Sequence, residues 1–127
     1  IGQSLVCLVA EIDEEPVGFL LSISDGADYG SANYLWLSEK VSKFSYRDRI
    51  CVDETRRGLK IGEKLYNALF DKLKDTGRSF VCEVNSRPPN PGSLRFHQRL
   101  GFEEIGTADH GEKAVVFLRK DPLGAAE

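Results

Sequence analysis

The sequence has no long hydrophobic run and no excess of basic residues. Its longest apolar segments, Val17–Ser22 and Ala114–Leu118, are far shorter than the roughly 18 residues of a membrane-spanning helix, so we predict no membrane partner. Lys and Arg number 17 and Asp and Glu number 20, which gives a net charge of -3. This balance argues against generic binding to a phosphate backbone, and we predict no nucleic-acid partner.

Methionine is absent and cysteine is scarce. The chain opens on Ile1 and enters the apolar segment Leu5–Ala10 without the basic region of a signal peptide, so we expect that Ile1 is not the natural start of translation. Cys7, Cys51 and Cys82 are odd in number and lie in apolar segments. This pattern favours reduced thiols in a cytoplasmic protein over a disulfide framework. No metal site is predicted.

The composition that remains is typical of one small globular domain. The 127 residues are 41% hydrophobic and 29% charged, which suits a single folded unit over residues 1–120 with a frayed tail over 121–127.

Residues 25–43 are the least regular stretch, and we predict a long loop there. Apolar segments between turn residues predict six strands: Leu5–Ile12, Val17–Ile23, Phe44–Val52, Ser79–Asn85, Phe102–Thr107 and Lys113–Leu118.

Two segments have helical character. Apolar residues recur every four positions from Ile61 to Leu73, and Gly77 ends this predicted helix. Ser93 is the predicted N-cap of a second, short helix that runs to about Leu100. The resulting order, β-β-β-α-β-α-β-β, predicts a mixed α/β fold with a central parallel strand pair and antiparallel flanking strands.

Along the strand Phe44–Val52, we expect Tyr46, Ile50 and Val52 to share one face. Cys51 and Cys82 are interpreted as small core residues of the two central strands, because no Cys–His–Asp spacing supports a nucleophile.

The junction between the third strand and the first helix has the properties of a phosphate site. Arg57, Gly58, Lys60 and Gly62 lie where a helix begins, and the first turn of a helix offers unpaired N–H groups and a positive dipole end. The spacing matches neither a Walker loop nor Gly-x-Gly-x-x-Gly, which disfavours a Rossmann dinucleotide site. The alternative is a solvated, Arg-rich helix start with an ordinary glycine turn.

A second motif, Asn90–Phe102, lies one strand downstream. Together the two motifs resemble those of the GCN5-related N-acetyltransferase (GNAT) superfamily, and the likeness covers about residues 5–120. Two residues depart from its pattern: Lys60 replaces a usual Gly, with a negative φ expected, and His97 replaces the usual Tyr. The matching residues are Arg57, Lys60 and Gly62 in the first motif and Asn90, Ser93, Phe96, His97, Gly101 and Phe102 in the second.

The resemblance implies transfer of an acetyl group from acetyl-CoA to an amine by direct attack on the thioester. It also implies that the family's first strand and two following helices, one wall of the acceptor site, are missing before Leu5. The acceptor is a small-molecule or peptide amine, and the negative net charge weakly favours a cationic one. The residues implied in cofactor binding are Ile50, Cys51 and Val52 for pantetheine amides, Arg57, Gly58, Leu59, Lys60, Ile61 and Gly62 for the pyrophosphate, and Asn90 for the pantetheine arm.

The resemblance places His97 where a tyrosine donates a proton to the departing sulfur. An imidazole with an ordinary pKa near 6.5 holds and releases a proton at neutral pH. The alternative is a histidine on the helix surface or one that is satisfied within the core.

Glu83 is the candidate general base, because it interrupts an apolar strand and a buried carboxylate needs a partner or a purpose. The alternative is a salt bridge to Arg49 or Arg87. Tyr46 and Asp48 are rival candidates, and a relayed water is a further one.

Two other functions stay open at this point. One is a non-catalytic acyl-CoA-binding or sensor domain on the same fold, since a fold does not fix a function. The other is a phosphate- or nucleotide-binding protein that uses only the turn at residues 57–62. The sequence is also compatible with a homodimer.

Overall fold

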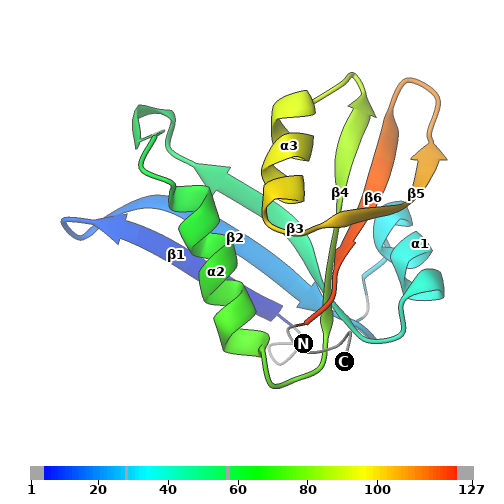
Figure 1. Cartoon of the computed structure of the whole chain (residues 1–127), viewed down its shortest axis with the longest axis horizontal. Coiled ribbons are helices and arrows are strands. Elements are labelled where there is room, and N and C mark those ends of the chain that lie inside the picture. The colour runs from blue at the N-terminus through cyan, green and yellow to red at the C-terminus, as the bar shows by residue number, and fades with distance from the viewer. Residues whose placement is uncertain (1–4, 28, 57, 123–127) are drawn as a thin grey trace.

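The computed structural model describes residues 5–27, 29–56 and 58–122. Six strands form one sheet in the order β1-β2-β3-β4-β6-β5, with three α-helices packed against it (Figure 1). Its strands are β1 Leu5–Ile12, β2 Glu15–Ser24, β3 Phe44–Val52, β4 Ser79–Arg87, β5 Glu103–Asp109 and β6 Ala114–Lys120. Its helices are α1 Ala32–Lys40, α2 Ile61–Leu73 and α3 Pro91–Arg99, with a short 3₁₀ turn at Glu54–Arg56.

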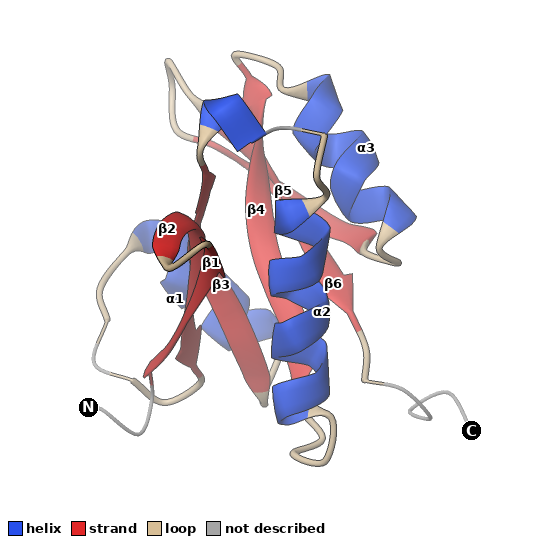
Figure 2. Cartoon of the chain, turned by 90° about the vertical axis from the view of Figure 1, so that its left-hand side faces the viewer, coloured by secondary structure: helices blue, strands red, loops and turns tan. Residues whose placement is uncertain are grey.

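The helices cover the two faces of the sheet unequally. Figure 2 shows α2 and α3 on one side of the strands and α1 on the other. Leu65 and Leu69 of α2 are buried in a core against β1, β2 and β4, and Leu37 of α1 is buried in a second core with Phe44 and Phe117. The pair β3–β4 is parallel and every other neighbouring pair is antiparallel, which confirms the predicted mixed α/β fold and its central parallel pair.

The prediction of an irregular loop over residues 25–43 was wrong, because α1 lies within it. Ser31 caps this helix, with Oγ accepting from the Tyr34 N–H at 3.0 Å. Tyr34 and Leu37, one helical turn apart, are buried, and the Trp36 ring stacks on Phe117 with centroids 3.9 Å apart. Burial of this face against the sheet stabilises a helix whose local sequence alone signals it weakly.

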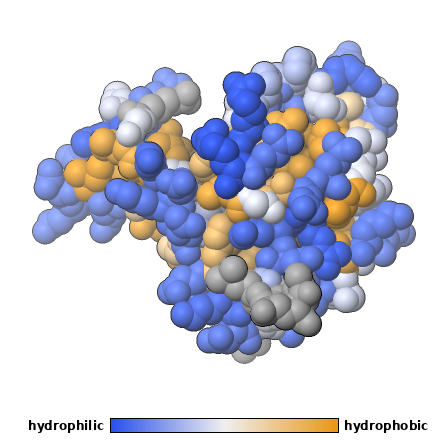
Figure 3. Space-filling model, viewed as in Figure 1, coloured by the Kyte–Doolittle hydropathy of each residue, from blue (hydrophilic) through white to orange (hydrophobic). Residues whose placement is uncertain are grey.

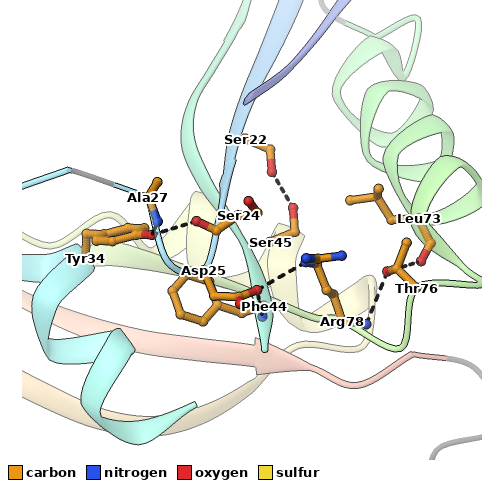
Figure 4. Close-up of polar contacts among 10 residues, drawn as sticks. All are labelled: Ser22, Ser24, Asp25, Ala27, Tyr34, Phe44, Ser45, Leu73, Thr76 and Arg78. Atoms are coloured by element: carbon orange, nitrogen blue, oxygen red, sulfur yellow. Dashed lines mark hydrogen bonds and ion pairs between the residues drawn. The ribbon is translucent and has the colours of Figure 1, made fainter. Parts of the chain in front are cut away.

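Polar contacts fix the segment before α1 to the sheet (Figure 4). The Tyr34 hydroxyl donates to the Ser24 carbonyl at 2.6 Å and accepts from the Ala27 N–H at 3.1 Å. Asp25 Oδ1 accepts from the Phe44 N–H at 3.0 Å and from Arg78 Nε at 3.1 Å. One carboxylate therefore links the end of β2, the start of β3 and the turn that precedes β4.

A β-bulge interrupts β3 at Asp48. The β2 register runs from Leu21↔Arg49 directly to Ser22↔Arg47, which leaves Asp48 as the extra residue. A bulge shifts the side-chain alternation of a strand by one position. Tyr46 consequently joins the core under α1, whereas Ile50 and Val52 pack against the core under α2, so the expectation that they share a face was wrong.

Two local expectations also need correction. Helix α3 is capped by Asn90, not Ser93, with Pro91 at its first position. Cys82 is fully buried as expected, but Cys51 is exposed, because its side chain lies on the opposite side of β3 from Ile50 and Val52. Part of the predicted frayed tail lies outside the described residues, while Asp121 Oδ1 accepts from Ser79 Oγ at 2.8 Å.

None of the helices formed by the described residues combines the length and the apolar character needed to cross a membrane.

Candidate active site

The site begins where the two central strands separate. Strands β3 and β4 pair at only three positions, Phe44↔Ser79, Ser45↔Phe80 and Tyr46↔Val81, although both continue for several more residues. Figure 1 shows the two strands diverging from this point. Backbone groups on the facing edges of both strands are therefore released from the sheet ladder beyond Tyr46.

A cleft of about 650 Å³ lies beside this separation, between α2 and α3. Figure 3 shows the hollow between the lobe that carries the β3–α2 loop and the lobe that carries α3. Residues from both sides of the strand separation line it: Ile50, Val52, Arg56, Gly58, Lys60, Ile61, Gly62, Glu63, Ser93, Phe96, Arg99 and Leu100.

Most of the cofactor residues expected from the sequence meet in this cleft. Cys51, Leu59 and Asn90 are not among its lining residues, and Arg57 lies outside the described residues. The sequence reasoning did not assign Arg56, Glu63, Ser93, Phe96, Arg99 or Leu100 to the site. The α3 members of this group, at positions 93, 96, 99 and 100, recur at helical spacing, and that signal would have found them.

The N-terminus of α2 faces the cleft with free N–H groups. The first α-helical bond runs from the Lys64 N–H to the Lys60 carbonyl at 3.0 Å, so the N–H groups of residues 61–63 precede the helical ladder. Arg56, Lys60 and Arg99 also line the cleft and add positive charge. A helix dipole, unpaired N–H groups and cations together form an anion site.

Gly62 allows α2 and α3 to approach each other closely at this site. A Cβ at position 62 would lie 3.3 Å from Cζ of Phe96, which is closer than ordinary van der Waals contact. The glycine therefore lets α2 pack closely against α3 where both helices line the cleft.

Lys60 has a left-handed backbone, with φ of +59°. The expectation of a negative φ at this position was wrong. A left-handed residue with a Cβ is strained by roughly 1–2 kcal/mol, and this conformation explains why a glycine suits the position. The turn also uses Gly58 at φ of +94°, so two left-handed residues reverse the chain into α2.

Asn90 has a structural role at the start of α3. Its side-chain Oδ1 accepts from the Ser93 N–H at 3.3 Å, and its own N–H donates to the Asn85 carbonyl at 3.2 Å. The pantetheine contact expected of Asn90 stays a prediction.

His97 is buried, with 1% of its surface exposed. Its Nδ1 lies 2.8 Å from the Ser93 carbonyl, which can only accept, so Nδ1 carries the proton. Nε2 then accepts from the Tyr66 hydroxyl at 2.7 Å and faces Arg47 Nη2 at 3.4 Å. Burial, and next the Arg47 cation, lower the pKa of His97 to about 4, while the Ser93 carbonyl opposes this.

This environment does not support the predicted imidazolium donor. With a pKa of about 4, His97 is neutral at pH 7, and both ring nitrogens are already engaged. The geometry favours the alternative of a satisfied core histidine that connects α3 to α2 and β3.

Glu83 lies on the other face of the sheet, in contact with Tyr46. The Tyr46 hydroxyl donates to Glu83 Oε1 at 2.7 Å, and the Tyr29 hydroxyl donates to Asp48 Oδ1 at 2.7 Å. Burial and the nearby Glu83 raise the pKa of Tyr46, and the bond to Asp48 raises that of Tyr29 to about 12. Both tyrosines are therefore neutral donors to carboxylates at neutral pH.

The alternative salt bridge from Glu83 to Arg49 or Arg87 is not formed in the described part of the chain. Arg87 instead pairs with Asp109, with Nη2 and Oδ2 2.8 Å apart. Burial raises the pKa of the Cys82 thiol, so it stays protonated and is no nucleophile. Within residues 5–27, 29–56 and 58–122, no group of three or more His, Cys, Asp or Glu residues is placed to hold a metal ion.

Comparisons with known proteins agree with this architecture. The chain is 23% identical over 116 residues to an aminoglycoside N(6')-acetyltransferase type 1 of Klebsiella pneumoniae, covering 91% of this chain and 56% of the relative. It is 29% identical over 119 residues to an N-alpha-acetyltransferase of Sulfurisphaera tokodaii, covering 91% and 68%. The chain thus spans little more than half the length of the aminoglycoside relative.

Solved structures share the fold at low sequence identity. The ribosomal-protein-S18-alanine N-acetyltransferase from Escherichia coli matches with a TM-score of 0.70 and 15% identity, over 95% of this chain and 71% of that one. An aminoglycoside 6'-N-acetyltransferase complexed with coenzyme A matches with a TM-score of 0.68 and 16% identity, over 93% and 73%. The family model described as "Acetyltransferase (GNAT) family" matches residues 2–102, and the chain belongs to this family.

Proposed function

We propose that this chain binds acetyl-CoA in the cleft between α2 and α3 and transfers its acetyl group to an amine. The observation that carries the proposal is the strand separation itself. The gap between β3 and β4 has the anion site at the N-terminus of α2 on one face of the sheet. The Glu83 carboxylate lies on the opposite face. Cofactor and acceptor would therefore approach the same opening from two sides.

The cofactor end of this proposal rests on charge and free backbone groups. The pyrophosphate would bind the N–H groups of residues 61–63, with Arg56, Lys60 and Arg99 supplying counter-charge. The pantetheine amides would pair with the edge of β3 at Ile50–Val52, which β4 does not cover. A fold neighbour that is described as complexed with coenzyme A supports this choice of ligand.

The acceptor end rests on the carboxylates. A protonated amine must lose a proton before its nitrogen can attack, and Glu83 is the proposed base for that proton, with Asp48 as the rival on the same face. The amine nitrogen then bonds to the thioester carbonyl carbon while the carbon–sulfur bond breaks. The electron pair of that bond goes to sulfur. Glu83 holds the proton that the ammonium gave up, and the second proton, which nitrogen loses as it becomes an amide, goes to solvent.

The test is release of free thiol from acetyl-CoA with a panel of amines, including aminoglycosides and peptides with free N-termini. We expect turnover with at least one amine and a loss of 10²-fold or more in Glu83→Gln, the usual contribution of a general base at about 10²–10⁴-fold. Glu104→Gln is the matched control, because Glu104 is an exposed carboxylate on the edge strand β5. Equal rates for both variants would exclude Glu83 as the base.

The neutral, buried state of His97 favours one second candidate, a non-catalytic acyl-CoA-binding domain. The His97 side chain cannot protonate a sulfur at neutral pH when its pKa is about 4. Calorimetric titration separates the two functions: tight binding of CoA without turnover on any amine would identify the binding domain.

A further inference from the structure

The Arg47 guanidinium lies at the point where β3 and β4 separate. Nε donates to the Tyr66 hydroxyl at 2.9 Å, and Nη2 donates to the Glu83 carbonyl at 3.2 Å and faces His97 Nε2 at 3.4 Å. Three elements, α2, β4 and α3, thus hold this one side chain in place. Arg47 is fixed in orientation before any ligand binds.

This cation has no anionic partner within the described part of the chain. Among the ion pairs between described residues, none involves Arg47. The side chains closest to it on α2, α3 and β4 are neutral, because burial raises the pKa of Tyr66 and of the Cys82 thiol, and His97 is unprotonated. The Glu83 carboxylate bonds to Tyr46, on the other face of the sheet. The Glu83 carboxylate still favours the charged form of Arg47 from a distance, but a largely buried charge without a direct ion pair is costly to keep.

One nitrogen of the guanidinium is left for a ligand. The bonds from Arg47 use Nε and Nη2 and leave Nη1 unused. No buried side-chain nitrogen in the described residues lacks a partner, so Nη1 reaches space that is accessible to solvent. Arg47 pairs with Ser22, two β2 positions from Leu20, the partner of Ile50 in the cleft wall.

We propose that Arg47 stabilises the thiolate of coenzyme A as it leaves the acetyl group, an assignment that rests on the proposed function. When the carbon–sulfur bond breaks, its electron pair stays on sulfur and is neutralised by the guanidinium, so the protein donates no proton to sulfur in this step. Glu83 holds the proton that the ammonium gave up, and the second proton of the nitrogen goes to solvent. His97 and Tyr66 act as positioning residues that aim Arg47.

The experiment measures the thiol pKa of bound CoA through the ultraviolet absorbance of its thiolate as pH is varied, with desulfo-CoA as the blank. A free thiol titrates near 8.5. We expect the thiol of bound CoA to titrate at least about 1 unit lower, a tenfold change in its proton affinity. The shift should vanish in Arg47→Met and persist in reduced form in Arg47→Lys, which keeps the charge but loses the fixed fork.

Arg99→Met is the control variant, because Arg99 is also a cleft cation but lies on α3, away from the strand separation. It should weaken CoA binding and leave the thiol shift intact. An unshifted thiol in the wild-type complex would overturn the role of Arg47 whether or not the variants fold, and so would a full shift in Arg47→Met. Failure of the wild-type protein to bind CoA at all would instead overturn the proposed function, and with it this role.

Discussion

At the scale of single residues, burial changes what a side chain can do. His97 occupies a motif position that predicts a proton donor, yet it donates to one carbonyl and accepts from Tyr66. Residue identity and spacing along the chain do not show that folding brings the Arg47 side chain next to His97. Because the pKa of His97 is lowered to about 4, the free energy of unfolding should depend on pH in a way that can be measured.

We expect His97→Gln to flatten the pH dependence of stability between pH 4 and 6.5. The folded protein binds this proton less tightly than the unfolded chain, whose histidine titrates near 6.5. The His97 contribution is therefore fully present above pH 6.5 and is lost as pH falls toward 4, by roughly 3 kcal/mol at most. Glutamine retains an acceptor for Tyr66 but does not titrate. Urea unfolding at pH 4.5 and 7 measures the difference.

His110→Gln provides the control, because His110 is an exposed histidine in the β5–β6 turn. It removes a histidine but leaves His97 in place, so the loss of stability that depends on His97 should remain. If His97→Gln and the wild type lose the same free energy of unfolding between pH 7 and 4.5, then the buried His97 does not carry the effect.

At the scale of elements, the start of α2 shows how a backbone conformation shapes the site. Lys60 turns the chain with φ of +59° and contributes an ammonium group to the cleft. The positive charge of the Lys60 side chain and its left-handed backbone are separate properties, and two substitutions distinguish their effects.

Lys60→Gly and Lys60→Ala both remove the charge, but only glycine adopts a left-handed backbone without strain. We expect the glycine variant to be more stable than the alanine variant by about 1 kcal/mol in urea unfolding. Calorimetry should show the same loss of CoA affinity in both, since each lacks the ammonium group. Greater stability of the alanine variant would show that the left-handed turn is not retained.

The sequence predicted the elements whose signals are local. Residues 61–73 repeat apolar side chains at helical spacing, and the strand Phe44–Val52 has the predicted bounds. Helix α1 was missed, although Tyr34, Leu37 and Val41 recur at helical spacing, because the surrounding turn residues outweighed that signal. The bulge at Asp48 depends on pairing with β2, which no local pattern reports. It was the bulge that placed Tyr46 and Ile50 on opposite faces.

At the scale of the whole molecule, the sheet consists of two halves with a narrow connection. Three parallel register pairs join β1-β2-β3 to β4-β6-β5, while the cleft is lined from both sides of that connection. The candidate site could be predicted in part, since both motifs were visible. Its opening could not, because it arises where two long strands stop pairing.

A ligand that fills this cleft should stabilise both halves together. We expect acetyl-CoA to slow amide hydrogen exchange at residues 61–63 and in α3, on the two sides of the connection. Binding at 100 times the dissociation constant stabilises a native state by about 2.7 kcal/mol, so the slowing of amides that exchange through global unfolding should approach 100-fold. Gly62→Val is the control, because a side chain at this position would meet Phe96, which also lines the cleft. Protection confined to residues 61–63 would mean that the ligand contacts one half only, and that phosphate binding at α2 does not extend to the strand separation.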